Sequence, residues 1–159
     1  MKGDAKVIEL LNEALRNELT AVNQYWLHYR LLDNKGVHKL AQFERHESIN
    51  EMKHADELSE RILFLDGLPN FQSLGRLRIG ENVEEILKAD LELELEAIEQ
   101  LKGAVVHSES VRDFTSRDLF AKILSNEEDH VDHLEQQFEM IAAMGLQNYI
   151  QLQSEAADD

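Results

Sequence analysis

The chain has 159 residues, no cysteine, one proline and seven glycines. Its length suits one domain with its own core, and the lack of cysteine excludes disulfide scaffolds, thiolate zinc sites and iron–sulfur clusters. The formal charge of −16 argues against nucleic-acid binding and favours attraction of cations. So few helix breakers favour a mainly helical chain. No apolar signal segment follows the N-terminus and no run approaches bilayer length, so we expect a soluble, cytoplasmic protein that does not enter a membrane.

The expected elements are helices separated by turn signals. Apolar residues recur at helical spacing from Val7 to Trp26. Turn-forming residues interrupt the chain after Asp33, at Asp66-Gly67-Leu68-Pro69 and again near Ser110. The long helices are predicted at about 5-34, 37-65, 82-110 and 113-144, and a short amphipathic fifth helix at about 146-153.

One sequence word occurs twice, as Asn50-Glu51-x-x-His54 and, 76 positions downstream (51 to 127), as Asn126-Glu127-x-x-His130. The same offset carries Glu18 to Glu94, each within a Leu-x-x-Glu-Leu-x-Ala frame. Glu and His three positions apart lie on one face of a helix, so both can reach the same point. The repeat predicts two matched ligand sets that hold two metal ions side by side: Glu18, Glu51 and His54, and Glu94, Glu127 and His130.

The positions of these acids also predict the topology. Glu18 and Glu51 are equally far from the first turn, and Glu94 and Glu127 are equally far from the break near Ser110. In an antiparallel hairpin such residues lie at the same height. About 16 extended residues can span the roughly 39 Å between the end of the second helix and the start of a parallel third one. We therefore predict an all-α, up-down-down-up four-helix bundle with a long crossover between helices 2 and 3.

The types of donor indicate the metal. Carboxylate and imidazole ligands suit iron and manganese. Glu51 and Glu127 are placed to bridge the ions and Glu18 and Glu94 to bind terminally, with one histidine for each ion. Four carboxylates offset the charge of two divalent ions and so favour oxidation to Fe(III). The alternative is a purely structural bundle, in which these acids form a polar network without metal.

Other polar residues are assigned with less support from their spacing. Tyr25 lies two helical turns after Glu18 and is expected either to supply an electron or hydrogen bond to the centre or to be a core tyrosine with a satisfied hydroxyl. His28, His38 and His107 are expected to be exposed or capping histidines.

Several stretches carry a resemblance to one family: Met1-Lys-Gly-Asp, Glu51-Met52-Lys53-His54-Ala55-Asp56, Arg61 to Asn70, and Gly145-Leu146-Gln147-Asn148-Tyr149. Through them the chain resembles the bacterioferritins, the haem-containing ferritins of the ferritin-like di-iron superfamily, over essentially its whole length. Two helices that give Glu and two that give Glu-x-x-His are also the general description of ferritin-like di-iron bundles. The resemblance implies a single ferritin-like domain over residues 1-159.

The resemblance also implies a function. Such proteins form hollow 24-subunit homo-oligomers, built from two-fold dimers, that store ferric mineral. Fe(II) would be oxidised by O2 or H2O2 at a di-iron centre holding two iron ions per subunit, which makes the protein a ferroxidase. One haem b per two subunits would assist electron delivery for iron release, with a bacterioferritin-associated ferredoxin as partner. The short segment after Gly145 would line channels at the four-fold axes.

Met52 is the residue that the resemblance assigns to haem, as the axial ligand from both subunits of a dimer. It stands about 100° around the helix from Glu51 and so faces sideways or outward. Leu19, Val22 and Trp26 continue an apolar strip in the same relation to the first helix, which indicates an interface. From spacing alone, a packing methionine is the simpler interpretation. Only the resemblance favours haem.

Two further interpretations stay open. His46 and Asn50 match positions that hold an accessory iron in some bacterioferritins, where the second position can be Asp; here the neutral Asn is a weaker ligand, and surface polar residues are the alternative. The rival function for the whole chain is a ferritin-like di-metal oxidase or oxygenase without storage. It would need a substrate pocket and no cage.

Overall fold

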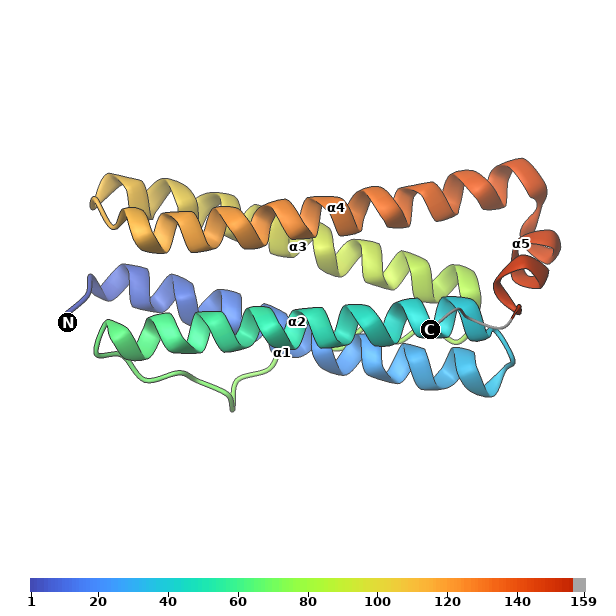
Figure 1. The fold of residues 1–159 in the computed structure, drawn as a ribbon, viewed down its shortest axis with the longest axis horizontal. Helices are drawn as coiled ribbons and strands as arrows, with labels where there is room; N and C mark the ends of the chain where they lie inside the picture. The colour runs from blue at the N-terminus through green and yellow to red at the C-terminus, as the bar shows by residue number, and fades with distance from the viewer. Residues whose placement is uncertain (156–159) are drawn as a thin grey trace.

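The computed structural model describes residues 1–155, which form five helices. They are α1 (Ala5–Asn34), α2 (His38–Phe64), α3 (Val83–Ser110), α4 (Phe114–Met144) and α5 (Leu146–Gln153). Figure 1 shows α1 and α2 antiparallel across a tight turn, a crossover that returns along the bundle, and then α3 and α4 as a second antiparallel pair. The predicted all-α, up-down-down-up bundle with a short fifth helix is confirmed. No helix within residues 1–155 is long and apolar enough to cross a membrane.

Local side chains explain where the helices begin. The carboxylate of Asp4 accepts the N–H of Val7 at 3.0 Å, and the amide oxygen of Asn82 accepts the N–H of Glu85 at 2.9 Å. Each bond satisfies a backbone donor that the first helical turn leaves without a partner. Between α1 and α2, Gly36 has φ +83°, a conformation that glycine adopts without strain. These bonds fix where α1 and α3 begin, and the turn fixes where α2 follows α1. They therefore help to set the position of each side chain along the bundle axis.

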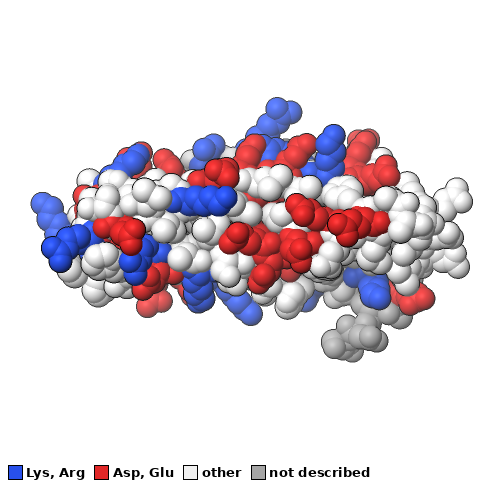
Figure 2. Space-filling view, turned by 90° about the horizontal axis from the view of Figure 1, so that it is seen from above, with Lys and Arg blue, Asp and Glu red and all other residues white. Residues whose placement is uncertain are grey.

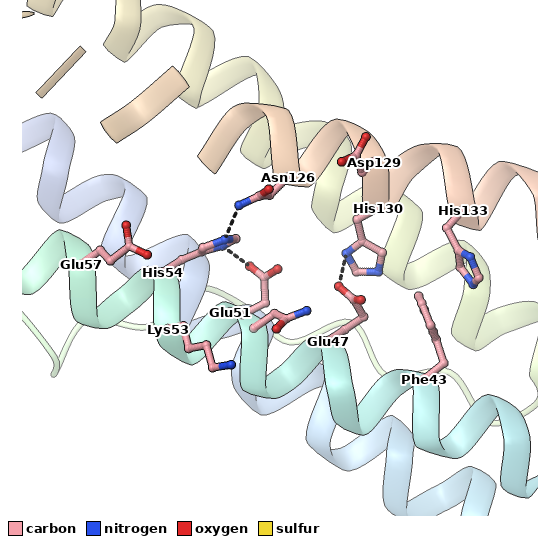
Figure 3. A pocket seen from close by; sticks show the side chains of 11 residues that line it. Phe43, Glu47, Glu51, Lys53, His54, Glu57, Asn126, Asp129, His130 and His133 are labelled. Carbon is pink, nitrogen blue, oxygen red and sulfur yellow. Dashed lines mark hydrogen bonds and ion pairs between the residues drawn. The ribbon is translucent and has the colours of Figure 1, made fainter. Parts of the chain in front are cut away.

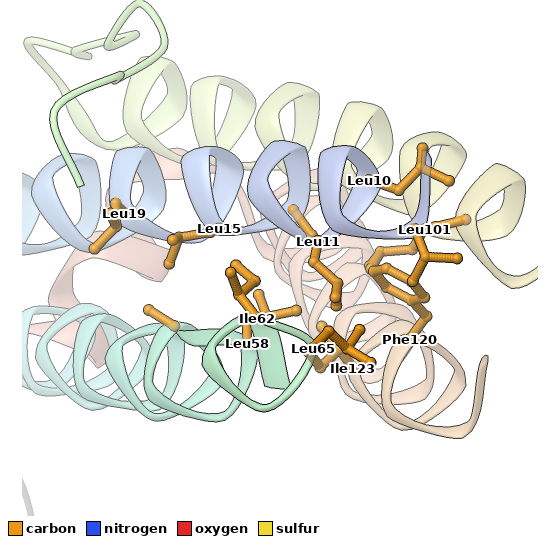
Figure 4. Packing of buried hydrophobic residues seen from close by; sticks show 14 residues of the cluster. Leu10, Leu11, Leu15, Leu19, Leu58, Ile62, Leu65, Leu101, Phe120 and Ile123 are labelled. Carbon is orange, nitrogen blue, oxygen red and sulfur yellow. The ribbon is translucent and has the colours of Figure 1, made fainter. Parts of the chain in front are cut away.

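The apolar core has two large clusters at opposite ends of the bundle and a small third cluster of Ala21, Tyr25 and Leu93. The first joins all four long helices and includes Leu11, Leu58 and Phe120 (Figure 4). The second surrounds Leu87 and Tyr149 and includes residues of α5. Along each long helix, the predicted metal ligands fall between or at the edge of these two clusters. The two clusters therefore hold a polar layer in the middle of the bundle.

Three buried side chains of α1 bind the crossover. The hydroxyl of Thr20 accepts the N–H of Gly75 at 2.8 Å, and the amide oxygen of Gln24 accepts the N–H of Arg78 at 2.9 Å. One turn further along the same helix, Nε2 of His28 accepts the N–H of Gly80 at 3.0 Å. Spacing by four residues places all three on one helix face, so this face of α1 supplies the hydrogen bonds that an irregular segment cannot make within itself.

His28 is therefore not the exposed or capping histidine that we predicted, because its side chain is fully buried. The expectation failed because its partners, Gly80 and Asp90, are distant in sequence. His38 is exposed and pairs with Asp33 at 2.9 Å, as a surface histidine would.

Candidate metal centre

The six predicted metal ligands meet in the polar layer between the two apolar clusters. The most exposed of them has only 6% of its surface accessible. Their donor atoms form two overlapping groups, each with atoms within 4.8 Å of one another: Glu18, Glu51, His54 and Glu127, and Glu51, Glu94, Glu127 and His130. Glu51 and Glu127 belong to both groups. This sharing is the arrangement that two bridging carboxylates would need.

Both histidines direct Nδ1 toward carboxylates. Nδ1 of His54 lies 3.1 Å from Oε1 of Glu127 and 3.6 Å from Oε1 of Glu18. Nδ1 of His130 lies 3.4 Å from Oε1 of Glu94. Each ring thus stands beside one carboxylate of the matched set and at least one other, so the six side chains converge on one small volume.

When no metal ion is bound, the buried side chains of the centre change one another's pKa values. Burial, together with the charges of Glu94 and Glu51, raises the pKa of Glu127 well above its ordinary value. Burial opposes ionisation of Glu94 as well, but hydrogen bonding with Glu127 and the charge of His130 lower its pKa to about 2. Burial would lower the pKa of His130, yet the nearby Glu94 raises it to about 9. The metal-free centre therefore holds both a carboxylic acid and an imidazolium.

The donor set fits metal ions. Both oxygens of Glu127, one oxygen of Glu94, Nδ1 of His54 and both ring nitrogens of His130 are buried without a hydrogen-bond partner. Buried polar atoms are costly unless something satisfies them. Four carboxylates and two imidazoles, facing one point, would be satisfied by two divalent ions such as Fe(II) or Mn(II).

Tyr25 adjoins this centre. Its hydroxyl donates to Oε1 of Glu94, and its ring centroid lies 5.2 Å from that of His130. Burial and the charge of Glu94 raise the pKa of Tyr25, so its hydroxyl keeps its proton. The hydroxyl of Tyr25 is thus satisfied within the core, and its partner is one of the predicted ligands, so the hydrogen bond fits both interpretations of this residue. That Tyr25 supplies an electron stays a prediction.

A cavity of about 520 Å³ opens onto the centre between α2 and α4 (Figure 3). The two histidine ligands form part of its wall together with Glu47, which sequence reasoning missed. Oε2 of Glu47 lies 3.3 Å from Nδ1 of His130, and burial raises the pKa of Glu47. Glu47 precedes Glu51 by four positions and so shares its helix face. That spacing was the signal available in the sequence.

The structure places His46 and Asn50, the two residues of the proposed accessory iron site, differently. His46 is exposed and lines a separate cavity that faces α4, whereas Asn50 is half-buried and lines the cavity of the centre. The accessory site stays a prediction. His133 lies on the wall of both cavities, stacked on Phe43 with ring centroids 4.0 Å apart.

Met52 lies on the outside of the chain, 43% exposed, although its neighbour Glu51 is buried. Trp26, expected on the same outer strip, is also 43% exposed. Leu19 is different: it is buried and packs in the first apolar cluster, because α2 covers that part of α1. The exposed strip is thus narrower than predicted.

Hydrogen bonds of the histidine argue against a metal site in a third group of potential ligands, which consists of His28, Glu44 and Asp90. Nδ1 of His28 lies 2.9 Å from Oδ1 of Asp90, which also accepts from Gln24 at 3.0 Å. Nε2 of His28 is occupied by the N–H of Gly80. With both ring nitrogens engaged, His28 cannot bind a metal ion. Both oxygens of Glu44 and Oδ2 of Asp90 are buried without partners, and one proton shared between the two carboxyls would satisfy two of these three oxygens.

This pair predicts a pH-dependent stability. Burial and the charge of Asp90 raise the pKa of Glu44 well above its ordinary 4.5. Folded Glu44 therefore keeps a proton that the unfolded chain loses, and the free energy of unfolding falls as pH rises above 4.5 toward the folded pKa. Glu44→Gln removes this loss and keeps the side chain's shape. In chemical denaturation of metal-free protein, we expect the variant to be more stable than the parent at pH 8 by about 1–3 kcal/mol.

The advantage should be much smaller at pH 4.5, where the unfolded parent also holds the proton about half of the time. Glu60→Gln is the control, because Glu60 is an exposed acid of the same helix. A difference between Glu44→Gln and the parent that is the same at both pH values would contradict the shared proton.

Charge on the surface agrees with cation binding. Figure 2 shows acidic side chains gathered near the middle of the long face that α3 and α4 form, with many of the basic side chains toward its ends and edges. Such a field raises the local concentration of cations.

Known proteins are similar to this chain in sequence. The family model named Ferritin, which describes the ferritin-like domain, matches residues 8–144 of the chain. Bacterioferritin from Brucella melitensis is 50% identical over 159 residues, which covers 100% of this chain and 99% of the relative. Bacterioferritin from Streptomyces coelicolor is 49% identical over 94% of this chain and 90% of the relative, and that from Rhodobacter capsulatus is 47% identical over 99% and 98%. With its fold, its paired Glu-x-x-His helices and these full-length similarities, the chain belongs to the bacterioferritin family.

Proposed function

We propose that this protein stores iron and oxidises Fe(II) to Fe(III) at the centre formed by its two matched ligand sets. The observation that carries the proposal is the convergence of six buried donors, with Glu51 and Glu127 shared between two groups. Membership of the bacterioferritin family supports iron as the metal. Dioxygen or hydrogen peroxide would accept the electrons.

The chain's own residues would bind two Fe(II) ions and balance their charge. Glu18 with His54 and Glu94 with His130 would each hold one ion, and Glu51 and Glu127 would bridge them. Four carboxylates neutralise the four charges of two Fe(II) ions, so the more highly charged Fe(III) is stabilised by anionic oxygen donors. The hydrogen bond from Tyr25 to Glu94 would orient that terminal ligand.

We further propose that the chain assembles into a 24-subunit cage of two-fold dimers and binds one haem b at each dimer interface. The exposed thioether of Met52, on the side of α2 away from the buried Glu51, supports the haem. Met52 of each of two copies related by a two-fold axis would hold the haem iron. When bound, the haem would supply one-electron redox chemistry for the release of stored iron, with a ferredoxin as partner.

Size-exclusion chromatography with absorbance at the protein and haem bands tests the assembly. The expected result is a particle of 24 subunits that carries about half a haem per chain. A cage without haem would remove the role of Met52 and leave iron storage in place. A monomer or a lone dimer would contradict storage.

The cavity beside the centre is the observation that favours the alternative function, a di-metal oxidase, because an oxidase needs space for an organic substrate. Its wall is polar, however, with Glu47, Lys53, Glu57 and Asp129 around the two histidines. Pockets for organic substrates are mostly apolar. A charged passage suits a cation better, so we favour iron as the molecule that uses it.

A further inference from the structure

We propose that Asn126 positions His54 for metal binding and that its amide can serve the histidine both before and after a metal ion arrives. This inference rests on the proposed di-metal function. It starts from one contact: Nδ2 of Asn126 lies 3.1 Å from Nε2 of His54 (Figure 3). The two residues belong to α4 and α2. Asn126 opens the second copy of the repeated word and His54 ends the first, so the contact joins the two halves of the centre.

The contact determines where the metal-free imidazole carries its proton. An amide nitrogen can only donate, so Nε2 of His54 accepts and the proton of the neutral ring lies on Nδ1. Nδ1 faces the centre, 3.1 Å from Glu127 and 3.6 Å from Glu18. The metal-free ring thus presents an N–H group to the carboxylates, which suits a centre without cations.

Metal binding requires the other tautomer. An ion at the centre needs the lone pair of Nδ1, so this nitrogen must release its proton and the ring must carry its proton on Nε2. The proton leaves Nδ1 to a carboxylate or to solvent, and Nε2 takes one from solvent at the rim, where Asn126 is exposed. Nε2–H then needs an acceptor. Rotating the amide of Asn126 by 180° brings Oδ1 to the place that Nδ2 occupied.

The side chain at position 126 should therefore set metal affinity through His54. A carboxylate there can only accept, so Asn126→Asp would favour the Nε2–H tautomer that binds metal. A leucine of similar size can serve neither tautomer. Partners that orient a ligating histidine typically change metal affinity 10–100-fold. Because Asn126 lies at an exposed rim, where water can replace part of its effect, we expect about 10-fold.

Asn50 supplies a matched control within the same chain. It is the counterpart of Asn126 in the repeat and lines the same cavity. Among residues 1–155, however, no hydrogen bond joins it to His130, whose Nε2 is buried without a partner. Asn50→Asp is made together with His46→Gln, so that the accessory iron site predicted at these two positions cannot form, and it then adds the same charge to the same cavity without touching the imidazole of His54.

The test is titration of metal-free protein with Co(II), followed by calorimetry and by the visible absorption bands of bound Co(II). We expect Asn126→Asp to bind Co(II) about 10-fold more tightly than the parent and Asn126→Leu about 10-fold more weakly. The Co(II) bands should shift in both variants because the orientation of a ligand changes. Asn50→Asp should match the parent more closely than Asn126→Asp does. Thermal unfolding of metal-free Asn126→Leu should remain close to that of the parent, since Asn126 is exposed.

Two results would contradict the role of Asn126 without contradicting the proposed di-metal function. Equal tightening by both Asp variants would mean that added charge acts without His54. Unchanged affinity in Asn126→Leu would mean that the amide does not orient the ring. If the parent protein itself binds fewer than two Co(II) ions per subunit, the proposed di-metal function fails, and the inference loses its basis with it.

Discussion

Replacing Glu127 with glutamine is expected to slow Fe(II) oxidation by at least about 100-fold, the upper end of what loss of a ligand's outer partner costs a metal site. Glu127 belongs to both ligand groups, lies 3.1 Å from His54, and has no partner for either oxygen. Glutamine keeps its shape but cannot supply an anionic bridge between two ions. Stopped-flow absorbance after mixing Fe(II) with metal-free protein in aerated buffer measures the rate.

The adjacent Glu128 provides the control. It is an exposed acid on the same helix, so Glu128→Gln makes the same change of charge outside the centre and should oxidise Fe(II) at the parent rate. Loss of the fold cannot account for the expected defect of Glu127→Gln. Because burial raises the pKa of Glu127, removing this carboxyl should stabilise the metal-free protein at pH 8. Parent-like oxidation in Glu127→Gln would show that Glu127 is not a ligand.

The bundle could be predicted from the sequence because its strongest signals are local or periodic. Helical spacing of apolar residues and turn residues such as Gly36 identify the helices, whose observed ends differ from the expected ranges by no more than one residue. The topology followed from geometry: acids equidistant from a turn, such as Glu18 and Glu51, lie level only in antiparallel helices. These two residues do meet, in one group of potential ligands.

Other features could not be predicted because they depend on partners in distant parts of the chain. Asp90 and Glu44 are 46 positions apart, and nothing in either helix alone marks them as neighbours in the core. His28 has no local pattern that distinguishes a crossover contact from a surface histidine. Leu19 was placed on an outer strip by its angle around the helix, but the packing of α2 against α1 covers it. The periodicity of a sequence gives the angle at which a side chain leaves its helix, but it does not identify the residue of another helix that the side chain contacts.

Asn126 is an intermediate case. The repeated word places an asparagine four positions before each histidine ligand, yet the residue that Asn126 contacts is His54, on another helix. A repeat shows which positions are equivalent. It does not show that equivalent positions make different contacts, as Asn50 and Asn126 do.

Met52→Leu is expected to abolish haem binding and leave the rate of Fe(II) oxidation unchanged. Leucine lacks a donor atom but has nearly the same volume, and such exchanges usually cost less than about 1.5 kcal/mol. Met52 is exposed on the outer side of α2, whereas its neighbour Glu51 is buried in the centre, so the two functions use different helix faces. Absorbance at the Soret band after reconstitution with haem, together with stopped-flow oxidation of Fe(II), measures both.

The control is Met140→Leu, the same exchange at a partly buried methionine of α4 that packs against the second apolar cluster. It should retain haem. Haem retained in Met52→Leu would place the axial ligand elsewhere, and slower iron oxidation in that variant would mean that the two sites are coupled. A third variant separates ligation from packing: histidine also ligates haem iron, so Met52→His should retain haem with a shifted Soret band and a lower reduction potential, because methionine ligation raises the potential. If Met52 only packed against its neighbours, haem binding would be the same in Met52→Leu, Met52→His and Met140→Leu as in the parent.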